Sequence, residues 1–274
     1  MEAKPVKASE WTIKDTRNLE YTGEIGKGDL FRLGRHLLLC GDSLGNGIYE
    51  YYSDKNISTM FTSPPYKMSH NLSWKNKNSE LKSKYLLPEL IKDYPKFLTD
   101  TTNRALDVCD YAFVNLQSLS NNKRDLLEYL YNLRDRYVDV LVWDKGYTAY
   151  PVVPNIFRSD FEFLYIFSRE KNPPRTIRCA PKFQGNISNV QHIRRKNRNE
   201  FANQHNATFP REFSDFVVEY LCGSTVLDMF AGTGTTLMSC EKFNRTWYGI
   251  EIVPEYCKII LDRWIRNGGK VEKV

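Results

Sequence analysis

The stretch TSPPY at residues 62–66 places a hydroxyl, two rigid residues and an aromatic ring at the end of an apolar run. Proline fixes φ near −65°, so consecutive prolines hold neighbouring acceptor groups in place. An aromatic ring beside fixed acceptors suits a planar substrate, which could lie against the ring face. Taken alone, the stretch favours an ordinary rigid turn, so partner motifs must decide between a turn and a substrate pocket.

A second stretch, TVLDMFAGTGTTLMSCEKFNRTWYGIEI at residues 225–252, suits an adenosine-like group. A predicted strand ends at Asp228, a loop with Gly232 and Gly234 leads into a helix, and the next strand ends at Glu251. Glycines let a ligand approach the backbone, and an acid at that strand tip accepts hydrogen bonds from ribose hydroxyls. The third glycine of the dinucleotide fingerprint and the GK[ST] of a P-loop are missing from this stretch, which disfavours NAD and ATP.

Positive charge is concentrated in one part of the chain. Residues 171–204, here called the basic segment, carry eight Lys or Arg against one Glu, whereas the whole chain has a net charge of +6. Such a run predicts either contact with a polyanion or a solvated surface loop. Charge alone leaves these two interpretations equally favoured.

The elements that would position these motifs read as strands alternating with helices. Apolar and β-branched runs predict seven strands, at residues 36–42, 58–63, 111–116, 139–143, 161–169, 225–230 and 247–252. Stretches with helical spacing lie at residues 87–108, 119–137, 210–222 and 253–267. Alternating strands and helices predict an α/β fold with a mostly parallel sheet covered on both faces. No helix separates residues 139–143 from 161–169, which predicts one antiparallel strand at a sheet edge.

Composition narrows the class of protein further. The 274 residues suffice for one large domain, and 41% of them are apolar without any run long enough for a membrane span. The N-terminus lacks an apolar signal region, which predicts a cytoplasmic protein. Six cysteines without a CxxC pair or a nearby histidine predict free thiols, with neither disulfides nor a metal site.

The motifs together resemble a known family. FAGTG at residues 230–234 resembles the S-adenosylmethionine motif of class I methyltransferases, and TSPPY resembles the catalytic motif of their amino-methyltransferases. The catalytic motif precedes the cofactor motif with the basic segment between them, an order similar to the permuted β group of DNA amino-methyltransferases. LLCGDS at residues 38–43 and HNATFP at residues 205–210 also match in order, so the resemblance spans residues 29–265.

The resemblance implies roles for named residues. It implies a Rossmann-like seven-stranded sheet with a small inserted recognition module, S-adenosylmethionine as cofactor, and a flipped base of double-stranded DNA as substrate. In the catalytic loop, Ser63 and the Pro64 carbonyl would accept the N–H groups of the target amine, and Tyr66 would stack on the base. The implied catalytic residues are Ser63, Pro64, Pro65 and Tyr66; the implied cofactor residues are Asp42, Phe209, Asp228, Phe230, Gly232, Gly234, Thr235 and Glu251; the implied DNA-binding residues are Arg175, Arg178, Lys182, Arg194, Arg195, Lys196 and Arg198.

The target base and the partners stay open. Family members with Ser before Pro-Pro tend to methylate N4 of cytosine and those with Asp tend to methylate N6 of adenine, so Ser63 favours cytosine, with adenine as the alternative. Methylation of an RNA or protein amide nitrogen and a catalytically dead DNA-binding regulator are further alternatives. The resemblance also implies a prokaryotic or phage source and allows a separately acting restriction endonuclease and a homodimer.

The same reading divides the chain into four parts. Residues 1–28 are expected to form an N-terminal arm, and residues 29–170 the catalytic part of the methyltransferase domain. The basic segment is expected to be the target recognition module, and residues 205–274 the cofactor-binding part.

Overall fold

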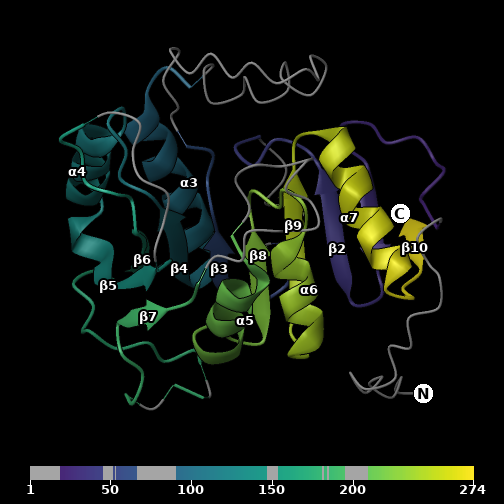
Figure 1. Cartoon of the computed structure of the whole chain (residues 1–274). Helices are drawn as coiled ribbons and strands as arrows, with labels where there is room; N and C mark the ends of the chain where they lie inside the picture. The colour runs from purple at the N-terminus through teal and green to yellow at the C-terminus, as the bar shows by residue number, and fades with distance from the viewer. Residues whose placement is uncertain are drawn as a thin grey trace.

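The computed structural model describes residues 19–45, 52, 54–66, 91–146, 154–180, 182–183, 185–194 and 209–274. The strands of these residues form one sheet in the order β10-β1-β2-β9-β8-β3-β4-β6-β5-β7 (Figure 1). Their bounds are β1 Leu30–Leu33, β2 His36–Cys40, β3 Ile57–Thr62, β4 Cys109–Leu116, β5 Tyr137–Asp144, β6 Phe161–Ser168, β7 Val190–His192, β8 Thr225–Asp228, β9 Thr246–Glu251 and β10 Val271–Lys273.

The seven expected strands are β2, β3, β4, β5, β6, β8 and β9, and they are contiguous in this sheet, which confirms the predicted α/β class. Strand β6 is antiparallel to both β4 and β5, so the antiparallel strand lies inside the sheet and not at its edge. Strand β7 extends the sheet beyond β5, and β1 and β10 extend it beyond β2. The sequence did not predict these three strands because runs of three or four residues carry little periodicity.

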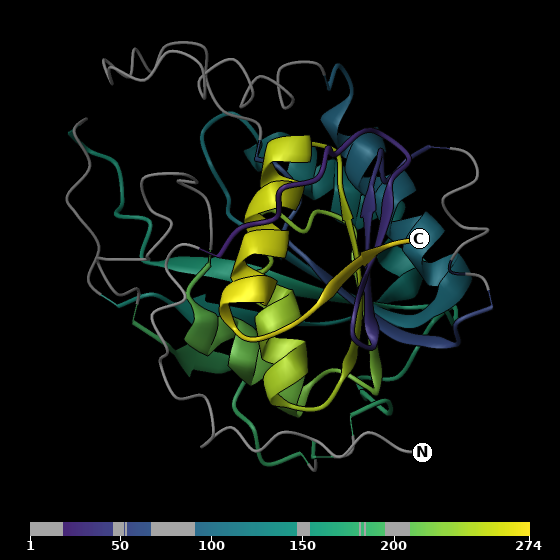
Figure 2. The same ribbon diagram turned by 90° about the vertical axis from the view of Figure 1, so that its right-hand side faces the viewer.

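Helices cover both faces of the sheet, as Figure 2 shows with α5, α6 and α7 on one side and α3 and α4 on the other. Two clusters of buried side chains match this layering. Phe61 packs in the cluster that includes residues of α5–α7, whereas its neighbour Met60 packs in the cluster that includes residues of α3 and α4. The helix bounds are α3 Tyr94–Val108, α4 Lys123–Asn132, α5 Arg211–Tyr220, α6 Thr235–Lys242 and α7 Pro254–Arg266, and a 3₁₀ turn spans Arg134–Arg136.

Local signals set where α3 begins. The Asp93 side chain accepts a hydrogen bond from the Lys96 backbone N–H, which makes Asp93 the N-cap, and Pro95 occupies the first turn. The helical spacing seen from residue 87 therefore becomes an α-helix only from Tyr94 within the described residues.

The segments expected to be peripheral have defined contacts where the structure describes them. The backbone N–H of Tyr21 donates to Asp262 of α7 over 2.7 Å, and its ring meets Phe31 edge-on. In the basic segment, β7 pairs with β5, and the Trp143 indole donates to the Ile193 carbonyl over 2.8 Å. The division of the chain into four parts stays a prediction.

Candidate active site

The two motif loops meet at one edge of the sheet. Strands β3 and β8 are adjacent and parallel, so the SPPY loop (residues 63–66) and the glycine loop (residues 229–234) both leave the sheet at its carboxyl edge. The Thr62 hydroxyl donates to Asp228 over 2.8 Å and lies 3.2 Å from the Phe230 backbone N–H, from which it accepts a hydrogen bond. A ligand on the glycine loop would therefore lie beside the SPPY loop.

The glycine loop needs its glycines. Gly232 and Gly234 have φ angles of 55° and 76°, a region that residues with a side chain rarely adopt. A Cβ at Gly234 would also lie 3.1 Å from Ile260 of α7, tighter than ordinary packing. Thr235, the first residue of α6, is buried behind this turn. The loop thus presents backbone at close range, as a bound nucleoside requires.

Glu251 ends β9 beside this loop with 7% of its surface exposed. Its carboxylate accepts from the backbone N–H of Gly232 over 2.8 Å and of Val253 over 2.9 Å. Burial raises the pKa of Glu251 to about 7, against the effect of the two amides and with a smaller contribution from Asp228. Since a carboxylate has about four acceptor positions, acceptor capacity is left for ribose hydroxyls.

Asp228 lies deeper, at 2% exposure. Burial raises its pKa to about 6, opposed by hydrogen bonds from the Thr62 and Thr236 hydroxyls. Asp228 therefore links the end of β8 to the end of β3. Glu251, in contrast, is the acidic residue at the strand ends whose carboxylate can accept further hydrogen bonds. This donor and acceptor set fits the adenosine part of S-adenosylmethionine.

The other expected cofactor residues have less specific surroundings. Asp42 follows β2, and its carboxylate accepts from the Leu44 backbone N–H over 2.9 Å, so it caps a turn. Half-buried Phe209 stacks on Phe61 with ring centroids 5.4 Å apart, and Phe230 lies 5.6 Å from the Phe97 ring. Both phenylalanines border the core and present part of their rings outside it.

The SPPY loop is held from two sides. The Tyr94 hydroxyl of α3 donates to the Pro65 carbonyl over 2.9 Å. The Tyr66 hydroxyl donates to Glu162 over 3.0 Å. Burial raises the pKa of Tyr66 well above its ordinary value, with a further contribution from Glu162, so the phenol keeps its proton.

Three buried polar residues at this edge were not predicted from the sequence. Lys145 follows β5, and its ammonium lies 3.3 Å from the carboxylate of Glu162, the second residue of β6. Asn115 on β4 is fully buried and donates to the Phe163 carbonyl over 3.1 Å. Of these three residues, only Lys145 and Glu162 had a signal in the sequence. Each is a charged residue close to an apolar run, and charged residues are rarely buried in a core.

The basic segment is only partly available for a ligand. Arg175 pairs with Asp139 over 2.7 Å and Lys182 with Glu219 over 2.6 Å, whereas Arg178 and Arg194 are exposed. Exposed ion pairs of this kind contribute about 0–1 kcal/mol, so a phosphate could compete for these cations. The remaining expected DNA contacts, Arg195, Lys196 and Arg198, lie outside the described residues.

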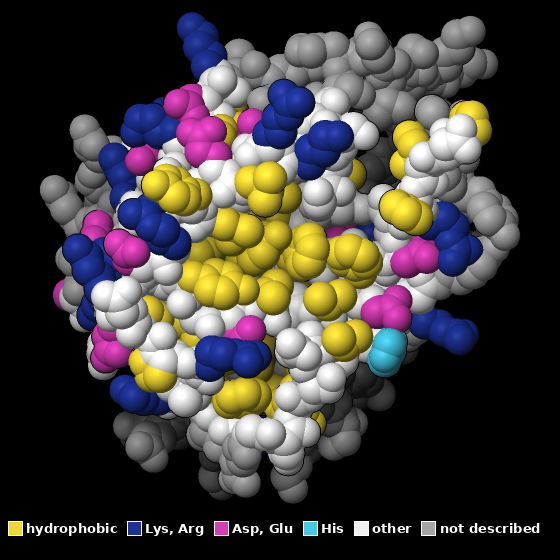
Figure 3. All heavy atoms as spheres, turned by 90° about the vertical axis from the view of Figure 1, so that its left-hand side faces the viewer, with side chains coloured by type: hydrophobic (Ala, Val, Ile, Leu, Met, Phe, Trp, Pro, Cys, Tyr) yellow, Lys and Arg dark blue, Asp and Glu magenta, His cyan; other side chains and the backbone are white. Residues whose placement is uncertain are grey.

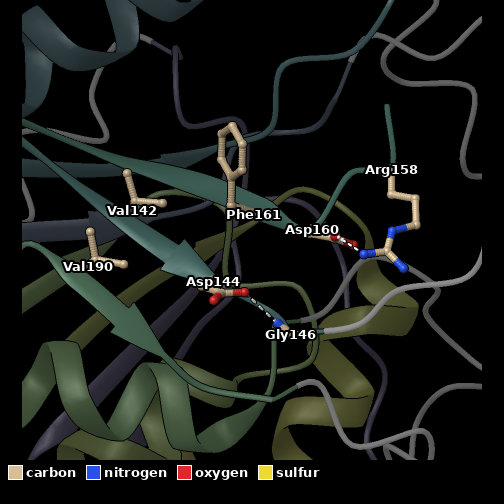
Figure 4. A pocket seen from close by; sticks show the side chains of 7 residues that line it. All are labelled: Val142, Asp144, Gly146, Arg158, Asp160, Phe161 and Val190. Atoms are coloured by element: carbon tan, nitrogen blue, oxygen red, sulfur yellow. Dashed lines mark hydrogen bonds and ion pairs between the residues drawn. The ribbon is translucent and has the colours of Figure 1, made fainter. Parts of the chain in front are cut away.

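A pocket of about 410 Å³ lies beyond β5, next to the basic segment (Figure 4). Asp144 in its wall accepts from the Gly146 backbone N–H over 2.7 Å and pairs with His192 of β7 over 2.6 Å. Arg158 and Asp160 also line the pocket and form an ion pair of 2.8 Å. The pocket thus mixes donors and acceptors, but it contains none of the expected catalytic or cofactor residues.

Other kinds of site have no support in the described residues. No group of three His, Cys, Asp or Glu side chains there is arranged to hold a metal ion, and all six cysteines are free. No helix among the described elements has both the length and the apolar character to cross a membrane.

Comparisons with known proteins match this geometry. Residues 57–262 match the sequence model of the N6/N4 family described as DNA methylase. The chain is 31% identical over 127 residues to the type II methyltransferase M.XycI of Xanthomonas campestris pv. cyanopsidis, covering 45% of this chain and 42% of that protein. It is 25% identical over 262 residues to the type II beta methyltransferase M.BslI of a Bacillus strain, covering 86% of this chain and 28% of that protein.

The chain therefore spans less than half the length of these curated relatives. Among solved structures, the PvuII cytosine-N4-specific DNA methyltransferase has a TM-score of 0.61 at 18% identity, covering 88% of this chain and 89% of that one. The M1.HpyAVI–SAM complex has a TM-score of 0.54 at 16% identity, covering 82% and 98%. At such identities the structures report a shared fold. The family match covers most of the chain and includes both loops, and the protein accordingly belongs to the N6/N4 DNA methylase family.

Proposed function

We propose that this protein transfers a methyl group from S-adenosylmethionine to the exocyclic amine of a flipped-out base in double-stranded DNA, with N4 of cytosine as the favoured target. The observation that carries the proposal is the 2.8 Å hydrogen bond between Thr62 and Asp228, the last residues of β3 and β8, from which the SPPY loop and the glycine loop leave the sheet. A substrate pocket and a cofactor site are thereby adjacent.

The cofactor site uses the glycine loop and the strand tips. The turn at Gly232 and Gly234 brings backbone close to the ligand, and Glu251 accepts hydrogen bonds from the ribose hydroxyls. The exposed parts of Phe209 and Phe230 wall the methionine part, and Asp42, next to the Gly41 amide that donates to the Glu251 carbonyl, accepts from the adenine amine. When bound, S-adenosylmethionine supplies an electrophilic methyl group on a sulfonium.

The SPPY loop prepares the amine. The lone pair of the target amine is delocalised into the base, so the amine nitrogen must be drawn toward tetrahedral geometry before it becomes nucleophilic. The Ser63 hydroxyl and the Pro64 carbonyl accept the two N–H groups and aim the lone pair at the methyl donor. The Tyr66 ring, held through its hydroxyl by Glu162, offers a face on which the flipped base stacks.

Cytosine is favoured over adenine because of Ser63. A neutral hydroxyl is a weaker acceptor than a carboxylate, so this pocket differs electrostatically from one with Asp at the same position. Adenine N6 is the alternative target, and an RNA or protein amide is a more remote one. A catalytically dead regulator is disfavoured because Ser63, Tyr66, Gly232 and Glu251 are all present at the shared edge.

DNA contact falls to the basic segment. Among the expected DNA contacts, Arg178 and Arg194 are exposed, and Arg175 and Lys182 can exchange their carboxylate partners for phosphates. Arg195, Lys196 and Arg198 complete the proposed set.

A homodimer and a partner enzyme are proposed as well. Figure 3 shows hydrophobic side chains gathered over the β5–β7 end of the molecule, where Phe161 and Val190 are 47% and 40% exposed. This face suits a homodimer, which light scattering after size-exclusion chromatography tests. A separately acting restriction endonuclease and a cytoplasmic location follow only from the kind of enzyme proposed.

The test is methylation with labelled S-adenosylmethionine of unmethylated plasmid DNA, RNA and mixed proteins in parallel. Nucleosides from the DNA are then separated and identified by mass spectrometry. We expect label in DNA as N4-methylcytosine. N6-methyladenine would select the alternative base, label in RNA or protein alone would overturn the DNA assignment, and cofactor binding without transfer to any substrate would indicate a regulator.

A further inference from the structure

The phenol of Tyr66 is tied to a buried ion pair. Its hydroxyl donates to Glu162 Oε2 over 3.0 Å, and Lys145 Nζ lies 3.3 Å from Glu162 Oε1. Lys145 is 5% exposed and Glu162 is 8% exposed, whereas Tyr66 is half-buried. The three side chains therefore form a row that runs from the proposed substrate pocket into the protein.

Tyr66 connects two strands that are not neighbours. It follows β3, whereas Glu162 belongs to β6, and β4 lies between these strands in the sheet. Neighbouring strands are about 4.8 Å apart, so the SPPY loop and the Tyr66 side chain together span about 10 Å of the sheet edge. The ring packs against the buried cluster that includes residues of α3 and α4. It is therefore held by apolar packing and, at its far end, by its hydroxyl.

The backbone beside the ring is held as well. The Tyr94 hydroxyl of α3 donates to the Pro65 carbonyl over 2.9 Å, and proline fixes φ at residues 64 and 65. The side-chain torsions of Tyr66 are then the main remaining freedom at the end of the loop. The hydrogen bond to Glu162 removes that freedom, because it fixes the position of the phenol oxygen.

The acceptor is itself built into the sheet. The backbone N–H of Lys145 donates to the Asp160 carbonyl over 2.8 Å, which keeps the end of β5 beside the start of β6. Asn115 of β4 donates to the Phe163 carbonyl over 3.1 Å, one residue after Glu162. Strands on both sides of β6 thus hold the backbone around Glu162, and the ammonium of Lys145 holds its carboxylate.

The burial of this ion pair needs a reason other than stability. Desolvation of a carboxylate and an ammonium often cancels their attraction, and apolar replacements of such pairs are often neutral or stabilising. An apolar residue at position 162, however, could not accept from the phenol. A carboxylate without Lys145 would accept, but it would be an uncompensated buried charge. The pair therefore supplies an acceptor for Tyr66 without a net charge behind the loop.

We propose that Glu162 and Lys145 are positioning residues for methyl transfer, which hold the Tyr66 ring in its stacking orientation before a base arrives. The phenol hydroxyl is engaged with the protein, so the ring offers the substrate its face. A flipped base then meets a fixed surface, which places its amine against the methyl donor. The inference rests on the proposed methyl transfer and adds the residues that prepare its stacking surface.

The first test replaces the ion pair by apolar side chains of similar length. Lys145→Met combined with Glu162→Met, here called the apolar variant, should unfold in urea with a free energy equal to or above that of wild type. We expect single-turnover methyl transfer at saturating DNA and cofactor to slow about ten- to a hundredfold, because a misplacement of about 1 Å can have an effect of this size. A wild-type rate in the apolar variant would overturn the proposal.

The loss should appear in the rate and not in binding. The affinities of the apolar variant for DNA and for S-adenosylmethionine should stay within about threefold of wild type, since neither the basic segment nor the glycine loop is altered. A fall in both affinities as large as the fall in rate would mean that the pair supports the fold as a whole, and would overturn the positioning role.

The second test is a double-mutant cycle with Tyr66→Phe, which removes only the hydroxyl and keeps the stacking surface. Tyr66→Phe should slow transfer in the wild-type background about as much as the apolar replacement does. In the apolar variant it should have little further effect, because the hydrogen bond is already absent. Equal losses in both backgrounds, or a wild-type rate for Tyr66→Phe, would show that the hydrogen bond does not position the ring.

A matched control removes another ion pair. Lys258→Met combined with Asp262→Asn disrupts a pair of 2.8 Å on α7, in which Asp262 is 8% exposed. Transfer by this control should stay within about twofold of wild type. A loss as large as that of the apolar variant would mean that the rate responds to any lost ion pair, which contradicts a specific role for Glu162 and Lys145.

The third test observes the ring without any reaction. Fluorotyrosine is incorporated at residue 66, and fluorine NMR spectra are recorded without DNA. In the otherwise wild-type protein we expect one signal displaced from that of free fluorotyrosine. In the apolar variant the signal should move toward the free position and broaden, because the ring samples several orientations. Identical signals in the two proteins would overturn the inference.

Wild-type activity distinguishes the inference from the proposed function. A wild-type protein that methylates no DNA refutes the proposed function and the positioning role with it. An active wild type whose apolar variant keeps both its rate and its fluorine signal refutes the inference alone.

Discussion

The carboxylate of Glu251 should make both stability and cofactor affinity depend on pH. Burial raises its pKa from 4.5 to about 7, so the folded protein binds this proton more tightly than the unfolded chain does. The stabilisation is therefore fully present below pH 4.5 and is lost as the pH rises through 7. A shift of this size corresponds to about 3 kcal/mol of unfolding free energy.

The perturbation is Glu251→Gln, which cannot titrate. Glutamine also leaves one backbone amide, of Gly232 or Val253, facing an NH₂ group, at a cost of about 1–3 kcal/mol at every pH. The unfolding free energy of each protein is therefore measured by urea unfolding at several pH values from 4.5 to 8. The informative quantity is the difference between wild type and variant in how steeply this free energy changes with pH. Asp228, whose pKa is also raised, adds the same pH dependence to the unfolding free energy of both proteins, so its contribution largely cancels in the difference.

The affinity for the cofactor should rise with pH, whereas the contribution of Glu251 to stability falls. Ribose hydroxyls donate best to the ionised carboxylate, so affinity for S-adenosylmethionine should rise about tenfold between pH 6 and pH 8 in wild type and stay flat in the variant. Glu241→Gln is the control, because its hydrogen bond with His36 lowers the pKa of Glu241 and keeps it ionised across this range. Parallel pH profiles for wild type and Glu251→Gln in calorimetry would refute this account of the site.

Other perturbations separate the roles of the remaining parts. Ser63→Ala should slow single-turnover transfer more than it weakens DNA binding, because the hydroxyl helps most as the amine pyramidalises, and cofactor affinity should be unchanged; a wild-type rate would make the loop a structural turn. Gly234→Ala should lower the free energy of unfolding by about 1 kcal/mol or more and weaken cofactor binding, because φ is 76° at this position and the new Cβ would lie 3.1 Å from Ile260. An unchanged melting temperature would contradict the predicted backbone strain. Neutralising Arg194, Arg195 and Lys196 together should lower DNA affinity and flatten its dependence on salt, and an undiminished salt slope would leave the basic segment as a solvated surface.

Much of this site could be predicted because its signals are local. The prolines of the SPPY loop and the glycines of the glycine loop fix backbone conformation within a few residues, whatever surrounds them. Asp228 and Glu251 were found because each ends an apolar run, and parallel strands bring such ends to one edge. The structure places these residues together as the pattern of strands and helices required.

Other features depend on which strands become neighbours, and pairing is set by contacts far apart in the sequence. Strand β6 lies inside the sheet because it pairs with β4 as well as with β5. Strand β7, which extends the sheet beyond β5, is too short to show a period. The partners of Arg175 and Lys182 lie 36 and 37 residues away.

The sequence by itself determined the α/β class, the two loops and their order, because hydrophobic periodicity and the special conformations of proline and glycine are properties of short segments. Only the tertiary structure decided that Lys145 reaches Glu162 and that Glu162 reaches Tyr66, 96 residues earlier in the chain. The pKa of Glu251 was decided in the same way, since burial by distant elements sets the cost of a charge. Electrostatics at this site is therefore a property of the packed sheet, and the residue types alone do not contain it.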